Sequence, residues 1–236
     1  QVYLDTLRPS NASQLLNRAL KLMDAQESPH EVAGLLTQIA ENQLNQGEPL
    51  KAAESLAKAR DLSFDYQEEQ DYIEARTMLR TGRLQDGLAL LNRLEQNNVA
   101  LALPKPQRFH RDTSLLTSLF HVILGNQEEA LAAAQKGLNA AEKSHASLGI
   151  RIGKMRLAHA KQLDIDRTLQ PDYVEEIKQL YEDAMRDMAV ARINVEPLWG
   201  MCRLLGYAGE LGEAMRVAQA AIALATQSGD VWIGMM

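Results

Sequence analysis

Two short stretches of this chain place an aromatic residue four positions before an arginine. These are Tyr72 with Arg76, and Trp199 with Arg203. Residues four apart point the same way on a helix, so each pair would present one ring and one guanidinium on a common face. Rings supply apolar contact area, and a guanidinium supplies directed hydrogen-bond donors. Both pairs therefore favour noncovalent binding of an extended peptide, a carboxylate-bearing ligand or a sugar.

The same register extends this candidate site along the chain. When the sequence is aligned on Gly82 and Gly209, the two pairs fall at equivalent positions, and the next helical turn adds one residue to each. Two further residues lie at the matching places before Gly47. The predicted ligand- or partner-binding residues are Glu41, Asn45, Tyr72, Arg76, Arg80, Trp199, Arg203 and Tyr207. The alternative interpretation is structural: the rings would pack between helices, and the arginines would be solvated or ion-paired.

The sequence offers no arrangement of residues for covalent or metal chemistry. It contains no GxxxxGK[ST], GxGxxG, HExxH or CxxC, and its five histidines form no pair spaced four apart. Acidic clusters such as those at Glu175 and Glu176 are typical of solvated helix faces. The single cysteine, Cys202, is expected to be a small apolar filler. We therefore predict no enzyme, no catalytic residue, no metal site and no cofactor.

The element that carries Trp199 and Arg203 is a pair of amphipathic helices between residues 196 and 230. Gly209 marks the turn of this pair, and Ala214, Ala218 and Ala221 give the second helix a face of small side chains. A partner helix can approach such a face closely. A hairpin of this kind cannot bury its own apolar stripe, so it is expected to stack on copies of itself.

The pattern recurs along the chain. The turn glycines Gly47, Gly82, Gly125 and Gly209 are separated by 35, 43 and 84 residues. Because the last interval is twice 42, it predicts a hidden pair, with helices over 148–162 and 172–191 joined by DIDRTLQPD instead of a glycine turn. We expect a helix over 29–45, a half unit over 10–25, a proline-containing connector over 101–112, and a helix N-cap at Asp230.

The spacing of Ala40, Gly47, Ala52 and Ala59 resembles the tetratricopeptide repeat, although most of that family's tryptophan, tyrosine and proline positions are replaced. The longer period, together with GELGEAMRVAQAAIALATQSGDVW and GNQEEALAAAQKGLNAAEKSHASLG, is similar to the superhelical sensor domain of MalT-like, LuxR-type signal-transduction ATPases. That resemblance implies a nucleotide-binding module and a DNA-binding helix-turn-helix domain elsewhere in the protein. DNA and ATP would then be bound only outside this segment.

These observations predict an all-α fold, a right-handed superhelix of antiparallel helix pairs. About five pairs and partial helices at both ends would form one tetratricopeptide-like solenoid over residues 1–236, a fragment of a longer protein. Aromatic residues make up only 5% of the chain, which leaves little to build a sheet. The net charge of −6 argues against gripping a phosphate backbone, and no apolar run is long enough to cross a bilayer.

The predicted function is a non-catalytic sensor or scaffold region of a bacterial transcriptional regulator. It would be cytoplasmic, would bind a small effector or a peptide or protein partner in a concave groove, and could form homo-oligomers. A free-standing adaptor or peptide receptor is the second hypothesis, and a helical appendage to an enzyme is the third.

Overall fold

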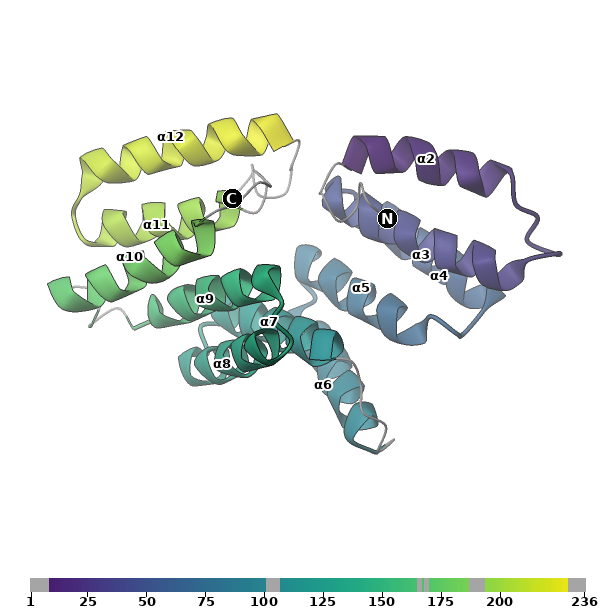
Figure 1. The fold of residues 1–236 in the computed structure, drawn as a ribbon, viewed down its shortest axis with the longest axis horizontal. Helices are drawn as coiled ribbons and strands as arrows, with labels where there is room; N and C mark the ends of the chain where they lie inside the picture. The colour runs from purple at the N-terminus through teal and green to yellow at the C-terminus, as the bar shows by residue number, and fades with distance from the viewer. Residues whose placement is uncertain (1–8, 101–106, 165–166, 168–169, 187–193, 229–236) are drawn as a thin grey trace. The chain divides into compact units, whose positions relative to one another are not determined.

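The computed structural model describes residues 9–100, 107–164, 167, 170–186 and 194–228. Within these ranges the chain forms α-helices and no strand (Figure 1). The all-α prediction is confirmed. The helices are α2 (Pro9–Lys21), α3 (Pro29–Asn45), α4 (Pro49–Leu62), α5 (Gln67–Arg80), α6 (Leu84–Ala100), α7 (Gln107–Leu124), α8 (Gln127–Lys143), α9 (Ser147–Lys161), α10 (Pro171–Met185), α11 (Val195–Tyr207) and α12 (Leu211–Ser228).

The predicted turn glycines each end the first helix of a pair. Gly47, Gly82, Gly125 and Gly209 have φ angles of 78°, 77°, 77° and 81°, in the left-handed region that glycine enters without steric cost. In each turn the amide after the glycine donates to a carbonyl five residues earlier, as Glu48 does to Gln43 at 2.9 Å. This Schellman geometry satisfies the last carbonyls of the helix and reverses the chain within two or three residues.

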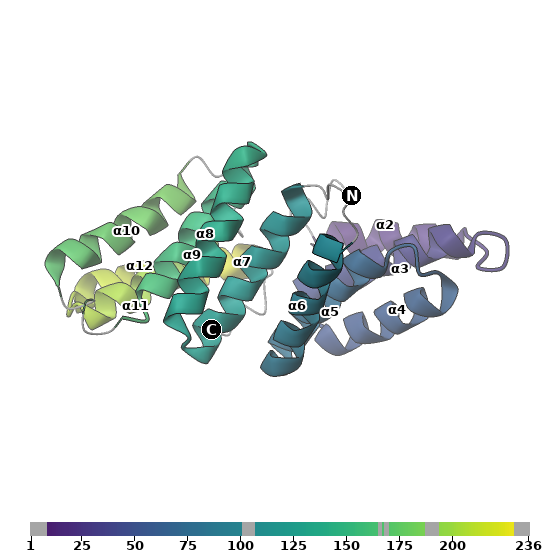
Figure 2. The same ribbon diagram turned by 90° about the horizontal axis from the view of Figure 1, so that it is seen from below.

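The helices divide into two compact units, which we describe separately. The described residues up to Leu94 form the first, with α2 to α5 and most of α6, and those from Glu95 to Ser228 form the second, with α7 to α12 (Figures 1 and 2). In the first unit the helices from α2 to α5 each pack on the next, and in the second unit those from α7 to α12 do the same. First helices of successive pairs also touch, as α3 touches α5. The continuous right-handed superhelix over the whole chain stays a prediction.

The first unit buries its apolar residues between pairs. Ala12 and Leu16 of α2 pack against Val32, Leu36 and Ile39 of α3, so the half unit is a helix that covers the first complete pair. This helix ends at Lys21, before the expected residue 25. A second cluster joins α3 and α4 to Ile73 of α5.

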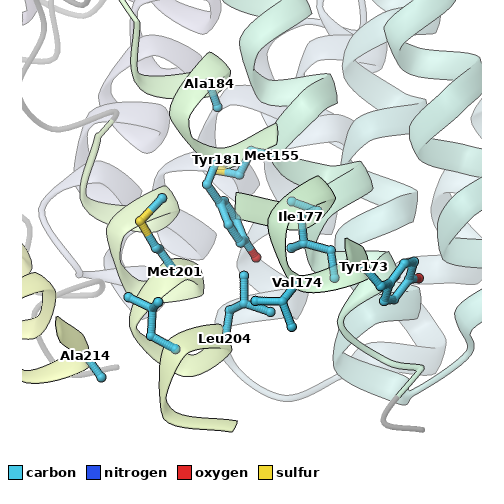
Figure 3. Packing of buried hydrophobic residues seen from close by; sticks show 11 residues of the cluster. Met155, Tyr173, Val174, Ile177, Tyr181, Ala184, Met201, Leu204 and Ala214 are labelled. Carbon is cyan, nitrogen blue, oxygen red and sulfur yellow. The ribbon is translucent and has the colours of Figure 1, made fainter. Parts of the chain in front are cut away.

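The second unit contains a larger core, centred on α10. Tyr181 lies at its middle and is fully buried, with the side chains of Met155, Ile177, Met201 and Leu204 around its ring (Figure 3). Residues of α9, α10, α11 and α12 all contribute to this cluster. The core is therefore shared by successive pairs, as expected of hairpins that cannot fold alone.

The hidden pair is present, as α9 and α10. Helix α9 covers Ser147–Lys161, within one residue of the expected range, but α10 ends at Met185 and not near residue 191. Arg186 has an extended backbone, with ψ of 134°. The sequence after Met185 has no glycine or proline to announce this end. The proline-containing connector expected over 101–112 is wrong in its second half, because residues 107–112 already belong to α7; residues 101–106 and Asp230 lie outside the described residues.

Helix glycines receive bulky side chains from neighbouring elements. A Cβ atom added at any of four glycines would overlap such a side chain: Gly34 with Tyr66, Gly137 with Leu115, Gly153 with Leu138, and Gly200 with Tyr181. By contrast, Gly206, on the same helix as Gly200, faces open space. Close packing of the pairs thus depends on glycine at the positions that face a bulky side chain.

Replacing Gly200 by alanine should destabilise the protein by about 1–3 kcal/mol, because the buried Tyr181 ring has no room to move aside. The matched change Gly206→Ala on the same helix should stabilise by about 0.5–1 kcal/mol, since alanine loses less backbone entropy on folding. Urea unfolding of both variants checks this. Shifts of the same sign would contradict the packing.

Candidate functional site

In the first unit, the predicted residues lie on α3 and α5, which are the first helices of successive pairs. Arg76 of α5 places Nη1 3.2 Å from Oε1 of Glu41, and its Nη2 donates to Oδ1 of Asn45 at 3.1 Å; both partners lie on α3. Its guanidinium carbon lies 6.0 Å from the centre of the Tyr72 ring. Arg80, one turn further along, is partly buried. Four of the predicted residues therefore lie together in the structure, at Glu41, Asn45, Tyr72 and Arg76.

The contacts of this first cluster join two helices and leave little for a ligand. The Arg76 side chain is only 20% exposed and is already neutralised by Glu41, so it has little charge left for a ligand. The cluster instead joins the first helices of successive pairs. Here the structural alternative raised from the sequence describes Arg76 better than the binding hypothesis does.

In the second unit, the three predicted residues form a different arrangement along α11. The guanidinium carbon of Arg203 lies 4.8 Å from the centre of the Trp199 ring and 6.0 Å from that of Tyr207. Both distances fit cation–π contact, which holds the guanidinium against the helix. We call Trp199, Arg203 and Tyr207 the α11 ledge.

Arg203 differs from Arg76 in its surroundings. It is exposed, and among the described residues no carboxylate lies within ion-pair distance of it. Tyr207 is 52% exposed, and Trp199 is partly buried. The ledge therefore presents an accessible ring and a cation that no described carboxylate pairs with, which is the chemistry needed to hold a carboxylate on an apolar support.

Beneath the ledge lies a buried polar cluster that the sequence analysis missed. Arg156 of α9 donates through Nη1 to Oε1 of Glu196 at 2.5 Å, and its Nη2 lies 3.4 Å from Oε2. The His159 ring lies 5.8 Å from Trp199, edge to face, and 5.4 Å from Tyr181. No spacing rule could show this, because the partners lie about forty residues apart on helices of different pairs.

This buried cluster bears on whether a carboxylate is available to pair with Arg203 of the ledge. Glu196 is the acidic residue in the first turn of α11, and Arg156 already engages both of its oxygens. Both oxygens of Glu196 therefore face Arg156, and Glu196 forms no ion pair with Arg203. The pair is only 9% and 18% exposed, so separating it would leave a buried charge uncompensated.

His159 is neutral within this cluster. Burial lowers its pKa to about 3, against the attraction of Glu196, and the nearby Arg156 and Arg203 lower it further. Arg156 can only donate, so the 3.4 Å contact to Nδ1 makes that nitrogen the acceptor and leaves the hydrogen on Nε2. Neither His159 Nε2 nor the Tyr181 hydroxyl has a hydrogen-bond partner among the described residues.

Metal ligation finds no support in the part of the chain that the structure describes. There, no group of three or more His, Cys, Asp or Glu residues could hold a metal ion.

Cys202 is partly buried and packs against the core of the second unit. No helix among the described residues is long and apolar enough to span a membrane.

Comparison with known proteins adds no family to this description. No protein-family model matches the chain, and no curated protein matches its sequence. The resemblance to MalT-like sensor domains therefore rests on repeat spacing alone, and the function it implies is a proposal.

The buried, neutral His159 should make folding sensitive to acid. Its folded pKa is about 3 and its unfolded value about 6.5, so the unfolded chain binds an extra proton between these limits. The contribution of neutral His159 to the free energy of unfolding is therefore largely present above pH 6.5. It is lost as the pH drops, by about 2 kcal/mol between pH 7 and pH 5.

Urea unfolding at both pH values, with wild type and His159→Gln, measures this contribution. The substitution should remove that part of the pH dependence, whatever it does to stability at pH 7. An unchanged pH dependence in His159→Gln would show that another group is responsible.

Proposed function

We propose that this chain is a non-catalytic binding module, the sensor or scaffold region of a bacterial transcriptional regulator. In this proposal a small effector or a protein partner binds to the first helices, and its occupancy is passed to DNA-binding activity in another part of the regulator. The support is of two kinds: the all-helical repeat architecture, and the chemistry of the α11 ledge.

The observation that carries the proposal is the state of Arg203. It is an exposed arginine held against two rings, and no described carboxylate neutralises it. Arg76, at the equivalent register position, has its own glutamate. One repeat thus uses its arginine to join helices, while the other leaves the arginine available.

The ligand group that fits the ledge best is a carboxylate. A guanidinium fork binds a carboxylate with two parallel hydrogen bonds, and the flanking rings can cover the attached apolar part. A hydrogen bond to a charged group contributes about 1.5–3 kcal/mol. A peptide side chain, a peptide C-terminus or a small organic acid would each supply this group.

The helix that carries the ledge contacts the preceding pair, so that binding at the ledge could affect the packing of that pair. Trp199 contacts His159 of α9, and Glu196 on the same helix as the ledge is paired with Arg156 of α9. A ligand that prefers one angle between α9 and α11 would shift the population toward that angle. The size of the shift is limited by its difference in affinity for the two arrangements.

The second candidate is a free-standing adaptor or peptide receptor, because the same ledge would serve a peptide carboxylate equally well. The full-length coding sequence separates the hypotheses. A nucleotide-binding module before this segment and a helix-turn-helix domain after it support the regulator. Repeats alone support the adaptor, and a catalytic domain supports a helical appendage to an enzyme.

The binding proposal predicts a ligand whose affinity depends on Arg203. Small carboxylates, sugars, nucleotides and short peptides are first screened by thermal shift, since a ligand of the folded state raises the melting temperature. The strongest is then titrated into wild type, Arg203→Gln and Arg216→Gln. Arg203→Gln should weaken binding at least tenfold, about 1.4 kcal/mol.

Arg216→Gln is the matched control, because Arg216 is an exposed arginine on the neighbouring helix, paired with Glu213. It should bind like wild type. Equal losses in the two variants, or no stabilising compound in the screen, would contradict binding at the ledge. Circular dichroism confirms that each variant keeps its helices.

A further inference from the structure

A second region of unusual charge lies between α9 and α10, at a cavity of about 210 Å³. The cavity is lined by Ser147, Ile150, Arg151 and Lys154 of α9, by Asp183 of α10, and by Arg186, the residue that follows α10. None of these residues belongs to the α11 ledge or to the buried cluster beneath it. The space exceeds several-fold the ~30 Å³ that one water molecule occupies in the liquid.

Three cationic side chains and one carboxylate line the cavity. Asp183 receives Lys154 Nζ on Oδ2 at 2.6 Å, and its Oδ1 lies 3.0 Å from Nη2 of Arg186. The Gln179 side chain also donates to Oδ1, at 3.1 Å. The hydrogen bond from Lys154 is the main cause that lowers the pKa of Asp183, so this carboxylate is charged at neutral pH.

The remaining cation, Arg151, has no counterion within its own helix. Positions three and four residues away on either side are Ser147, Leu148, Lys154 and Met155. Helix α9 contains two arginines, two lysines and no acidic residue, in a chain whose net charge is −6. Among the described residues, no carboxylate forms an ion pair with Arg151. The lining therefore has a surplus of two positive charges.

We propose that this cavity binds a dianionic phosphate group, either free or as a phosphomonoester. Its charge of about −1.5 to −2 at neutral pH matches the surplus, and its oxygens suit the arginine fork. Arg151, Lys154 and Arg186 would donate to the oxygens, and Ser147 would add a hydroxyl. The apolar wall at Ile150 leaves room for part of an organic group.

Occupancy would connect the two helices of the hidden pair. Arg151 and Lys154 belong to α9, while Arg186 follows the end of α10, so a bound phosphate would bridge α9 and Arg186, which Asp183 now links through Lys154. Asp183 would compete with the ligand, because it occupies donors of the same cations. This competition gives the proposal a test in which two variants shift affinity in opposite directions.

The test is calorimetric titration of the whole chain with inorganic phosphate at pH 8 and constant ionic strength. Arg151→Gln should weaken binding at least fivefold, and Asp183→Asn should tighten it severalfold, because the competing carboxylate is gone. Arg186→Gln, at a side chain 66% exposed, should weaken binding without cost to folding. Arg216→Gln controls for general loss of positive charge and should change nothing.

Phosphoserine and adenosine monophosphate titrated in parallel distinguish the source of the phosphate. Tighter binding of either ester than of phosphate assigns the cavity to a phosphorylated ligand, and equal or weaker binding assigns it to the free anion. No saturable binding of any of the three, or equal effects of Arg151→Gln and Arg216→Gln, would overturn the proposal. So would a folded Asp183→Asn variant that binds more weakly than wild type.

Discussion

The structure depends on the close approach of helices that cannot bury their apolar faces alone. Contacts such as that of Tyr181 with Gly200 show how this is achieved: one helix omits a side chain where its neighbour presents a large one. The fully buried Tyr181 belongs to a core shared by four helices. Within each unit, neighbouring pairs share a core, and this holds the first helices, with the clusters built on them, in a fixed register.

The same register position carries two different chemistries in the two units. Arg76 is neutralised by Glu41 and bonded to Asn45, so it serves packing between pairs. Among the described residues Arg203 has no carboxylate partner, and Glu196, the nearest acidic residue toward the N-terminus on its own helix, is paired with Arg156. The proposed sensing role follows from this difference and not from the repeat itself.

The sequence predicted the features that local rules control. A glycine with positive φ has a strong signature, so the turns at Gly47 and Gly209 and the range of α3 were found correctly. The glycine alignment also put Arg76 and Glu41 at matching positions of successive pairs, and in the structure they form an ion pair. The end of α10 at Met185 was missed because the following residues contain neither glycine nor proline, and their spacing continues the helical pattern.

What the sequence could not show is contact between residues far apart in the chain. The pairing of Arg156 with Glu196 and the burial of His159 depend on how α9 meets α11, which no spacing reveals. The cavity beside Arg151 depends likewise on where α10 ends, one residue before Arg186. The absence of acidic residues from α9 was visible in the sequence, and that charge bias was the signal that could have found this second region.

A double-mutant cycle between Tyr181 and Gly200 tests the central claim most directly, because it measures whether neighbouring pairs fit together as described. Unfolding free energies are compared for wild type, Gly200→Ala, Tyr181→Leu and the double variant. If the tyrosine fills the space that the glycine leaves, Gly200→Ala costs much less once Tyr181 is shortened, with a coupling energy of about 1 kcal/mol or more. Additive effects would show that the two residues do not meet, and would contradict the shared core.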